Sequence, residues 1–291
     1  MADCPVCGAS SSLVLHQVGE YAVLECPACE LRFSDPMRHP GPCWYTRSPL
    51  YVERRERKVK VPMFVTRRDW RYRTFFSLHM NPSGRLLEIG CGSGAFLSLA
   101  EQRGYRVTGI DADTSAIKTA RQAYRLKNVR AVSIEELLND SVERLFDVIC
   151  LFDVLEHLQD PLATMQGLAA MLSDSGKIVC SVPSHQRWPH WFAGDVDLPP
   201  HHLTLWSRPS LAKCFEKAGL RAAMAIRNPL LGENLLNQAN WRCSMLRRPD
   251  AVGMALRAGG QFVVMPVLAR MLRLLVPEAG GFTLLGVGTK P

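Results

Sequence analysis

A strand, a glycine-rich loop and a helix are indicated by residues 86–103. The run Leu86–Ile89 is apolar apart from Glu88, and glycines follow at positions 90, 92 and 94 before the amphipathic stretch Ala95–Arg103. The apolar run predicts a short buried strand, and the 3.6-residue periodicity after it predicts a helix. Glycines in such a turn let the backbone bend sharply and bring peptide N–H groups close to a ligand. The chain therefore predicts a pocket of the kind that holds a nucleotide.

Two classes of ligand compete for this pocket. Gly90, Gly92 and Ala95 fit the G-x-G-x-x-G/A fingerprint of dinucleotide sites, and Asp111 follows at the distance expected for a ribose acceptor. Glu88, however, places a carboxylate at the mouth of the loop, where it would repel a pyrophosphate. The same carboxylate suits the ammonium group of S-adenosylmethionine (SAM), whose ribose still needs Asp111. The charge of Glu88 favours SAM, and a dinucleotide is the alternative.

Three stretches of the chain resemble the class I SAM-dependent methyltransferases: Glu88–Gly94, Gly109–Asp113 and Phe146–His157. The third, with its trailing Leu158–Pro161, is close to a signature of the small-molecule branch that includes quinone O-methyltransferases. The resemblance spans roughly residues 85–220. It implies a SAM-dependent methyltransferase acting on a small-molecule acceptor, with O-methylation of a natural-product, quinone-like or lipid-linked substrate as the expected reaction. It is specific for cofactor and fold and says little about the acceptor.

The remaining pattern predicts an α/β fold with a Rossmann-like, seven-stranded methyltransferase sheet. Strands and helices alternate, which is typical of a doubly wound parallel sheet, and the resemblance implies that the last strand runs antiparallel. We expect a zinc-ribbon module at 1–45, a basic helical linker at 46–80 and a methyltransferase domain at 81–291 with a helical insertion at about 228–280. The expected strands are Arg85–Ile89, Arg106–Ile110, Val129–Val132, Val148–Phe152, Lys177–Val182, Arg221–Ile226 and Phe282–Thr289.

Two C-x-x-C pairs, Cys4 with Cys7 and Cys26 with Cys29, flank an 18-residue spacer, Gly8–Glu25. The spacer alternates apolar and polar residues, which predicts two short strands. This spacing lies in the zinc-ribbon range and allows four thiolates to bind Zn²⁺ tetrahedrally. Because four protein ligands leave no open position, the predicted zinc is structural. Reversible redox chemistry of these cysteines is the alternative.

Ligands of open α/β sheets bind beyond the carboxyl ends of the strands, and this rule selects the cofactor residues. The resemblance implies that Glu88 and the loop Gly90–Gly94 cradle the methionine part and that Asp111 accepts the ribose hydroxyls. Ser133 stands where many relatives have an aspartate, so Glu135 is the candidate on the adenine side. The complete candidate set is Glu88, Gly90, Cys91, Gly92, Gly94, Asp111, Ala112, Glu135 and Phe152.

Asp153 and His157 follow the expected fourth strand, next to the position of the transferable methyl group. The unperturbed pKa of a histidine suits His157 to act as the base that a hydroxyl acceptor needs. The alternative is that Glu156 and His157 begin a helix and hold it in place. In the quinone O-methyltransferases an E-x-x-E-H motif binds a divalent cation. Here the first acid is Asp153, whose side chain is one methylene shorter than glutamate, and this difference disfavours binding of Mg²⁺ at the motif.

The segment His185–Trp206 is rich in histidine and tryptophan. Such side chains suit a lid over a flat acceptor, with His201 or His202 as base. Packing of the loop on the sheet edge is the plain alternative. A second zinc site is disfavoured, since no acids or histidines accompany the segment at a matched spacing.

The net charge of +8 is concentrated between Arg47 and Arg73, where ten Lys or Arg residues stand against three acids. Such a segment binds nucleic acid, a membrane surface or an anionic substrate, or is a solvated helix face. An RNA methyltransferase and a non-catalytic SAM-binding regulatory protein are therefore alternatives. The apolar insertion suits a homodimer interface or membrane-surface contact. The absence of a signal peptide, together with paired C-x-x-C motifs, predicts a cytoplasmic protein.

Overall fold

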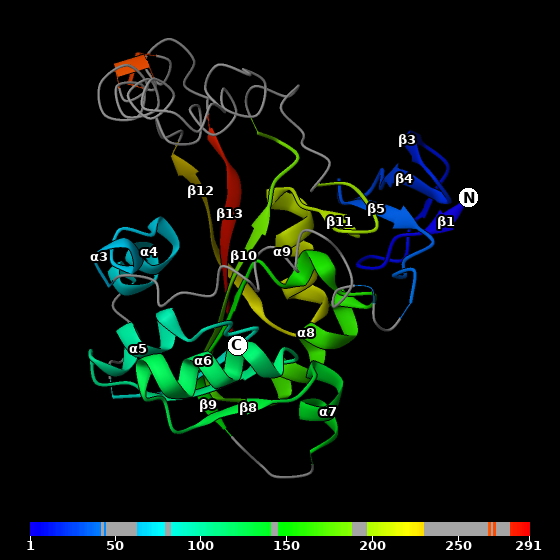
Figure 1. Ribbon diagram of the computed structural model, residues 1–291. Coiled ribbons are helices and arrows are strands. Elements are labelled where there is room, and N and C mark those ends of the chain that lie inside the picture. The colour runs from blue at the N-terminus through cyan, green and yellow to red at the C-terminus, as the bar shows by residue number, and fades with distance from the viewer. Residues whose placement is uncertain are drawn as a thin grey trace, which may run out of the picture.

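A seven-stranded sheet forms the centre of the computed structural model (Figure 1). The structure describes residues 1–41, 44, 63–78, 83–140, 145–187, 197–229, 267–268, 270–271 and 280–291. The strand order is β12-β13-β10-β9-β6-β7-β8. The strands are β6 (Arg85–Ile89), β7 (Arg106–Asp111), β8 (Val129–Ala131), β9 (Phe146–Phe152), β10 (Leu172–Pro183), β12 (Arg221–Pro229) and β13 (Gly280–Thr289).

Each of the seven strands predicted from the sequence is present. Strands β10, β9, β6, β7 and β8 pair in parallel, whereas β13 runs antiparallel to both β10 and β12. The order reverses between β6 and β9, which is the point where ligands bind in doubly wound sheets. The expected α/β fold and the antiparallel last strand are confirmed.

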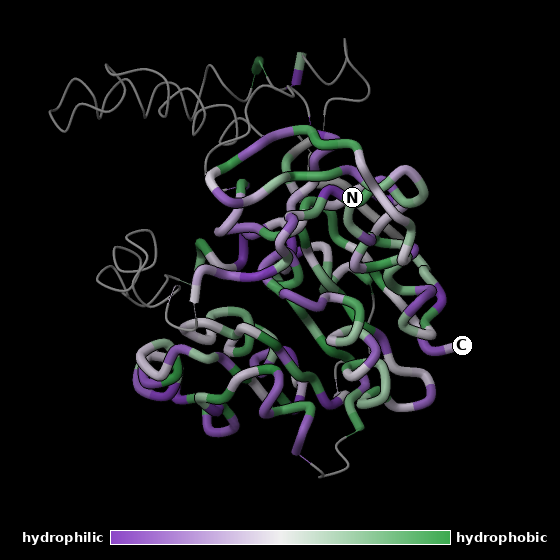
Figure 2. Tube along the Cα trace, turned by 90° about the vertical axis from the view of Figure 1, so that its right-hand side faces the viewer, coloured by the Kyte–Doolittle hydropathy of each residue, from purple (hydrophilic) through white to green (hydrophobic). Residues whose placement is uncertain are grey.

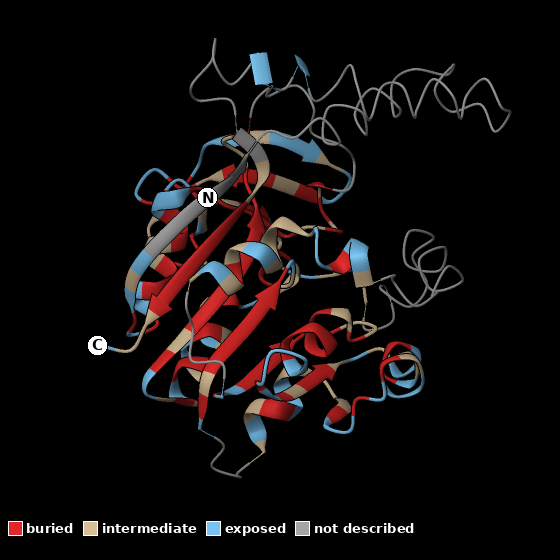
Figure 3. Cartoon of the chain, turned by 90° about the vertical axis from the view of Figure 1, so that its left-hand side faces the viewer, coloured by how far each residue is buried: buried red, intermediate tan, exposed pale blue. Residues whose placement is uncertain are grey.

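Helices cover both faces of the sheet and give it two cores. On one face, α3 (Met63–Thr66), α4 (Trp70–Ser77), α5 (Ala95–Glu101) and α6 (Thr114–Tyr124) pack around buried side chains such as Phe75 and Phe96. The other face carries α7 (Ile134–Asn139), α8 (Pro161–Ala170) and α9 (Arg208–Lys217). The strands between these layers are largely buried (Figure 3) and are hydrophobic over much of their length (Figure 2).

Local signals explain where the helices begin. Asp113 caps α6 by accepting hydrogen bonds from the amides of Ser115 and Ala116, and Ser133 with Glu136 forms a capping box on α7. Asp160 caps α8, whose first residue is a proline. These caps lie in the loops that leave β7, β8 and β9. The expected helix at Glu156 and His157 is a single 3₁₀ turn, Leu155–His157, that ends before α8.

The N-terminal module is a small β structure joined to the main domain. It contains β1 (Ala2–Asp3), β2 (Ser10–Ser11), β3 (Val14–Val18), β4 (Tyr21–Glu25) and β5 (Arg32–Asp35). The two strands expected in the spacer are β3 and β4. Strand β5 also pairs with β11 (Thr204–Leu205), so the second sheet has the order β11-β5-β4-β3 (Figure 1). Residues of the module, among them Leu31 and Phe33, share one buried core with Trp206 and Phe215.

Several sequence predictions fall outside the described residues. These are most of the basic linker before Met63, most of the insertion at 228–280, and residues 188–196 of the histidine-rich segment. Among the residues that the structure describes, no helix is long and apolar enough to cross a membrane.

Candidate active site

The glycine loop is held against the end of β7. Gly90, Gly92 and Gly94 all have positive φ, between 52° and 83°, a conformation that glycine adopts without strain. A Cβ added to Gly90 would lie 2.6 Å from Cγ2 of Val154. The Cys91 amide donates to the Ile110 carbonyl at 2.9 Å, and the Gly92 amide donates to Oδ2 of Asp111 at 2.8 Å. The loop is therefore fixed by the same aspartate that was predicted to bind the ribose.

Asp111 organises the turn after β7. Its Oδ1 accepts a hydrogen bond from the Asp113 amide at 2.8 Å, while Oδ2 accepts from Gly92. Both backbone donors therefore converge on one carboxylate, which ties the glycine loop to the turn after β7. Asp113 itself caps α6 and has a structural role.

Glu88 is a buried carboxylate on β6. It is only 3% exposed, and its Oε2 meets no hydrogen-bond donor in the part of the chain that the structure describes. Burial, and then the negative charge of Asp111, raise the pKa of Glu88 well above the usual value. A buried polar group without a partner is costly. A cationic ligand at this position would remove that cost.

A cavity of about 890 Å³ opens beside the loop. It is lined from the sheet by Gly90, Asp111 and Ala112, and by Glu135 at the start of α7. His157 and the N-terminal residue His39 line it as well. The structure thus brings four of the predicted cofactor residues to one cavity. Cys91 is buried beneath the loop, and Phe152 packs against the rings of Tyr72 and Phe96, so both belong to the core.

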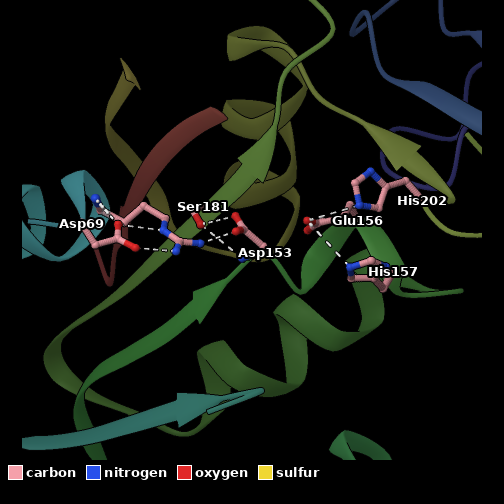
Figure 4. Close-up of polar contacts among 7 residues, drawn as sticks. Asp69, Asp153, Glu156, His157, Ser181 and His202 are labelled. Atoms are coloured by element: carbon pink, nitrogen blue, oxygen red, sulfur yellow. Dashed lines mark hydrogen bonds and ion pairs between the residues drawn. The ribbon is translucent and has the colours of Figure 1, made fainter. Parts of the chain in front are cut away.

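Asp153 engages a different group of side chains from the one that the sequence suggested. It has a φ of 57°, accepts a hydrogen bond from Ser181 Oγ at 2.7 Å, and forms an ion pair with Arg71 of α4. Arg71 also binds Asp69, at 2.6 Å. Figure 4 shows Asp153 beside Ser181, with Glu156, His157 and His202 on the other side. Sequence reasoning missed Arg71, which is one of ten basic residues in its segment.

Glu156, His157 and His202 converge at the end of β9. Oε1 of Glu156 lies 4.0 Å from Nε2 of His157 and 4.0 Å from Nε2 of His202 (Figure 4). The ring centroids of the two histidines are 4.8 Å apart, and His201 stacks on His202 at 4.7 Å. The predicted residues His157, His201 and His202 are therefore neighbours in space, although 44 positions separate the first two.

Burial controls the protonation of this cluster. Desolvation, and then the negative charge of Asp153, raise the pKa of Glu156 well above its usual value. Desolvation and the adjacent His202 lower the pKa of His157 well below that of a free histidine. Against the opposing effect of burial, His202 and Arg187 hold the pKa of Asp197 below its usual value. The lowered pKa makes His157 a weaker proton acceptor than a free histidine and leaves it a neutral ring near neutral pH, the form that binds a metal ion.

The four cysteines of the N-terminal module converge as predicted. Sγ of Cys4 lies 3.6 Å from Sγ of Cys29, and Sγ of Cys7 lies 3.4 Å from Sγ of Cys26. All four sulfurs lie within 4.8 Å of one another, and none forms a disulfide. Tetrahedral Zn²⁺ with Zn–S bonds of about 2.3 Å needs sulfurs about 3.8 Å apart. The hydrogen bond between Cys4 and Cys29 lowers the pKa of Cys4 and raises the pKa of Cys29, so that contact favours one thiolate in the pair.

The module also holds the backbone around the histidines. Nε2 of His39 lies 2.8 Å from the His157 carbonyl, and Nδ1 lies 3.1 Å from the Pro200 carbonyl. The Ser34 amide donates to the Leu203 carbonyl at 2.9 Å, and the Leu203 amide donates to the Glu156 carbonyl at 2.8 Å. No sequence signal identified His39, because its partners lie more than 100 residues away.

The strand order, the glycine loop and the acids at the ends of β6 and β7 together define a class I methyltransferase fold. Residues 51–223 match the sequence profile of the methyltransferase domain family. Because this match covers more than half of the chain, the protein belongs to that family.

Relatives support the assignment. A ubiquinone biosynthesis O-methyltransferase of Alkalilimnicola ehrlichii is 32% identical over 113 residues, which cover 38% of this chain and 45% of the relative. Its counterpart in Xanthomonas axonopodis is 31% identical over 163 residues, 50% of this chain and 67% of the relative. This chain matches about half the length of ubiquinone O-methyltransferases that are among the most similar to it in sequence. A SAM-dependent methyltransferase structure from Archaeoglobus fulgidus has a TM-score of 0.57 at 18% identity, covering 82% of this chain and all of that one.

Proposed function

We propose that this protein is a SAM-dependent methyltransferase that methylates an oxygen of a small molecule. The observation that carries the proposal is the buried Glu88 carboxylate, which lacks a hydrogen-bond partner among the described residues and lies next to a glycine loop fixed by Asp111. A ligand that offers an ammonium to Glu88 would satisfy its buried oxygen, and ribose hydroxyls suit the Asp111 carboxylate at the rim of the cavity. SAM has both groups, and a dinucleotide would place a pyrophosphate against Glu88.

The cofactor residues divide the work between the two ends of SAM. Glu88 and the loop Gly90–Gly94 hold the methionine part, while Asp111 and Ala112 hold the ribose. Glu135 lines the same cavity and offers a carboxylate on the adenine side. Because the loop is already hydrogen-bonded to Asp111, little ordering remains to be done when the cofactor binds.

The acceptor lies on the His157 side of the cavity. Its oxygen attacks the methyl carbon in line with the sulfonium; the new C–O bond forms as the C–S bond breaks, and sulfur leaves as a neutral thioether. The proton of the acceptor hydroxyl passes to the group formed by Glu156, His157 and His202. A phenolic or quinone-like acceptor is the class to test initially, since the matched relatives are named for O-methylation in ubiquinone biosynthesis.

We also propose that Cys4, Cys7, Cys26 and Cys29 bind one structural Zn²⁺. The sulfur separations fit tetrahedral thiolate coordination, and four protein ligands leave no position for chemistry. The metal would stabilise the module that supports β11 and the backbone of the histidines.

The cofactor assignment is tested by calorimetric binding of S-adenosylhomocysteine to the wild-type protein and to Glu88→Gln. A hydrogen bond to a charged group contributes about 1.5–3 kcal/mol against about 0.5–1.5 kcal/mol for a neutral acceptor, so loss of the charge is expected to weaken binding by about 5- to 10-fold. Glu101→Gln on the exposed surface of α5 is the matched control and should bind normally. Equal binding by Glu88→Gln and the wild type would contradict the assignment.

The acceptor class is tested by transfer of a radiolabelled methyl group from SAM into a fractionated extract of the source organism. Label in the small-molecule or organic-soluble fraction supports the proposal. Label in RNA or protein would refute it and make the basic segment the substrate-binding surface. Tight cofactor binding with no labelled product in any fraction would favour a non-catalytic SAM-binding protein.

A further inference from the structure

The convergence of Glu156, His157 and His202 has the composition of a metal site. One ligand atom from each, Oε1 of the glutamate and a ring nitrogen of each histidine, lies within 4.8 Å of the other two. Glu156 is 1% exposed, and its Oε2 finds no donor within the described part of the chain. A buried carboxylate with one oxygen left without a donor, close to two imidazoles, is an arrangement that a cation stabilises.

A hydrogen bond at Nδ1 of His157 and an ion-pair contact at Nδ1 of His202 accompany the approach of both Nε2 atoms to Glu156. Nδ1 of His157 lies 2.8 Å from the His201 carbonyl. Since a carbonyl only accepts, the proton must be on Nδ1, and Nε2 becomes the ligating atom. On the other ring, Nδ1 of His202 lies 3.5 Å from Oδ1 of Asp197, which Arg187 holds at 2.7 Å. Carbonyl and carboxylate partners of this kind orient histidines in known metal sites.

The donor set differs from that of the quinone O-methyltransferase motif. In that motif the acid three residues before the glutamate binds the cation, together with the glutamate and the histidine. Here the corresponding residue is Asp153, whose two oxygens are taken by Ser181 and Arg71. Asp153 is absent from the convergent group, and His202 contributes a nitrogen in place of that carboxylate oxygen. The pattern of the resembling branch therefore does not fit this chain.

Replacement of an oxygen donor by a second imidazole changes the class of ion. Mg²⁺ prefers carboxylates, carbonyls and water in an octahedral shell, whereas imidazole suits zinc, iron, cobalt and nickel. Two histidines and one carboxylate leave coordination positions open, as in catalytic zinc and non-haem iron sites.

We propose that Glu156, His157 and His202 bind a divalent transition-metal ion at a second site, separate from the four cysteines. His157 also lines the cavity beside the glycine loop, so the proposed site adjoins that cavity. The role of this ion rests on the proposed function: a bound metal lowers the pKa of an acceptor hydroxyl and holds its oxygen. Binding of the ion does not depend on that reaction.

Metal content separates the two sites without any measurement of activity. The full-length protein is prepared with Co²⁺ and dialysed, and its metal is quantified by mass spectrometry alongside its visible absorption spectrum. The wild type is expected to hold one equivalent at the cysteines, seen as thiolate-to-cobalt charge transfer, and a second equivalent without that signature. His202→Ala and Glu156→Gln should lose the second equivalent and keep the charge-transfer band.

Two variants serve as controls. His16→Ala removes an exposed histidine of β3 and should keep both equivalents. Asp153→Asn should also keep both metal equivalents. A site built on the E-x-x-E-H motif of the quinone O-methyltransferases would lose its metal in this variant. Far-ultraviolet circular dichroism and the urea midpoint of each variant show that its domain is folded, and Glu156→Gln preserves shape if His202→Ala fails to fold.

Two results would overturn the proposal: a wild type that holds metal only at the cysteines, or Asp153→Asn losing the second equivalent while His202→Ala retains it. Failure of the methylation proposal is distinguishable, because it would appear as absent cofactor binding or absent methyl transfer with the metal content unchanged.

Discussion

Substitution of Asp111 by asparagine tests whether one carboxylate both fixes the glycine loop and binds the cofactor. In the structure Oδ2 accepts from the Gly92 amide and Oδ1 from the Asp113 amide, each at 2.8 Å. Asparagine supplies only one acceptor oxygen, so its NH₂ group must face one of these two N–H donors. The variant therefore loses one of the two hydrogen bonds from the backbone. The other remains, but its acceptor is an uncharged amide oxygen instead of a carboxylate.

The expected effect on cofactor binding follows from the ribose. Two hydroxyls that donate to an ionised carboxylate gain about 1.5–3 kcal/mol each, against about 0.5–1.5 kcal/mol for a neutral acceptor. Together with the disturbed loop, the loss is about 3 kcal/mol, which corresponds to roughly 100-fold weaker binding. We therefore expect Asp111→Asn to bind S-adenosylhomocysteine about two orders of magnitude less tightly than the wild type.

Isothermal titration calorimetry measures this difference, and Asp113→Asn is a matched control two residues away. Asp113 caps α6 through hydrogen bonds to the amides of Ser115 and Ala116, and asparagine caps helices about as well as aspartate. The control should therefore bind normally. Binding by Asp111→Asn within about threefold of the wild type, less than about 0.7 kcal/mol, would refute the reasoning.

Three further changes have expected outcomes. Gly90→Ala would place a Cβ 2.6 Å from the Val154 side chain at a residue with positive φ, whereas Gly19 has a positive φ but open space around it. Calorimetry should therefore show a greater loss of unfolding free energy for Gly90→Ala than for Gly19→Ala. Phe33→Ala should lower the unfolding free energy by about 3–5 kcal/mol and lower the temperature of a single cooperative unfolding transition, because Phe33 lies in the core shared by module and domain. Val14→Ala, at an exposed position of the module, should be nearly neutral. Separate unfolding transitions for module and domain would argue against a shared core. Burial, and then the charge of Arg32, lower the pKa of His185 to about 4, so the unfolded state binds more protons and stability falls between pH 6.5 and pH 4. The wild type should lose up to about 2 kcal/mol of unfolding free energy between pH 7 and pH 5 through this histidine, and His185→Gln should not show that loss. The unfolding free energy is measured by urea titration at each pH. The same pH dependence in both proteins would contradict this prediction.

The sheet was predictable because its signals are local. Apolar runs alternating with amphipathic stretches marked all seven strands, and the ends of β6 and β7 differ from expectation by at most one residue. Strand β10 begins at Leu172, five residues before the predicted start at Lys177. Its pairing with β9 starts at Leu172, shifts in register, and resumes at Lys177. Local periodicity does not reveal such an interruption.

The acceptor side was not predictable in the same way. Ser34 lies in β5, whose partner β11 is about 170 residues further along the chain, and no pattern in the residues around Ser34 indicates that pairing. The spacing argument against a second metal site compared residues within one segment. Glu156 comes from the turn after β9 and His202 from the loop before β11, so their approach depends on how that loop packs, which spacing cannot indicate.

The two halves of the site therefore depend on different parts of the chain. The cofactor half is built within two neighbouring strands: Glu88 on β6, Asp111 on β7 and the loop between them, joined by hydrogen bonds of short sequence separation. The acceptor half is assembled over long range, since His39 contacts the carbonyls of His157 and Pro200 and Ser34 binds Leu203. The N-terminal module contributes Arg38, His39 and Gly41 to the lining of the cavity. The proposed ion at the four cysteines would stabilise β5 and, through it, the backbone that presents Glu156, His157 and His202. The module can in this way shape the proposed acceptor side while the loop between β6 and β7 keeps the form of the family fold.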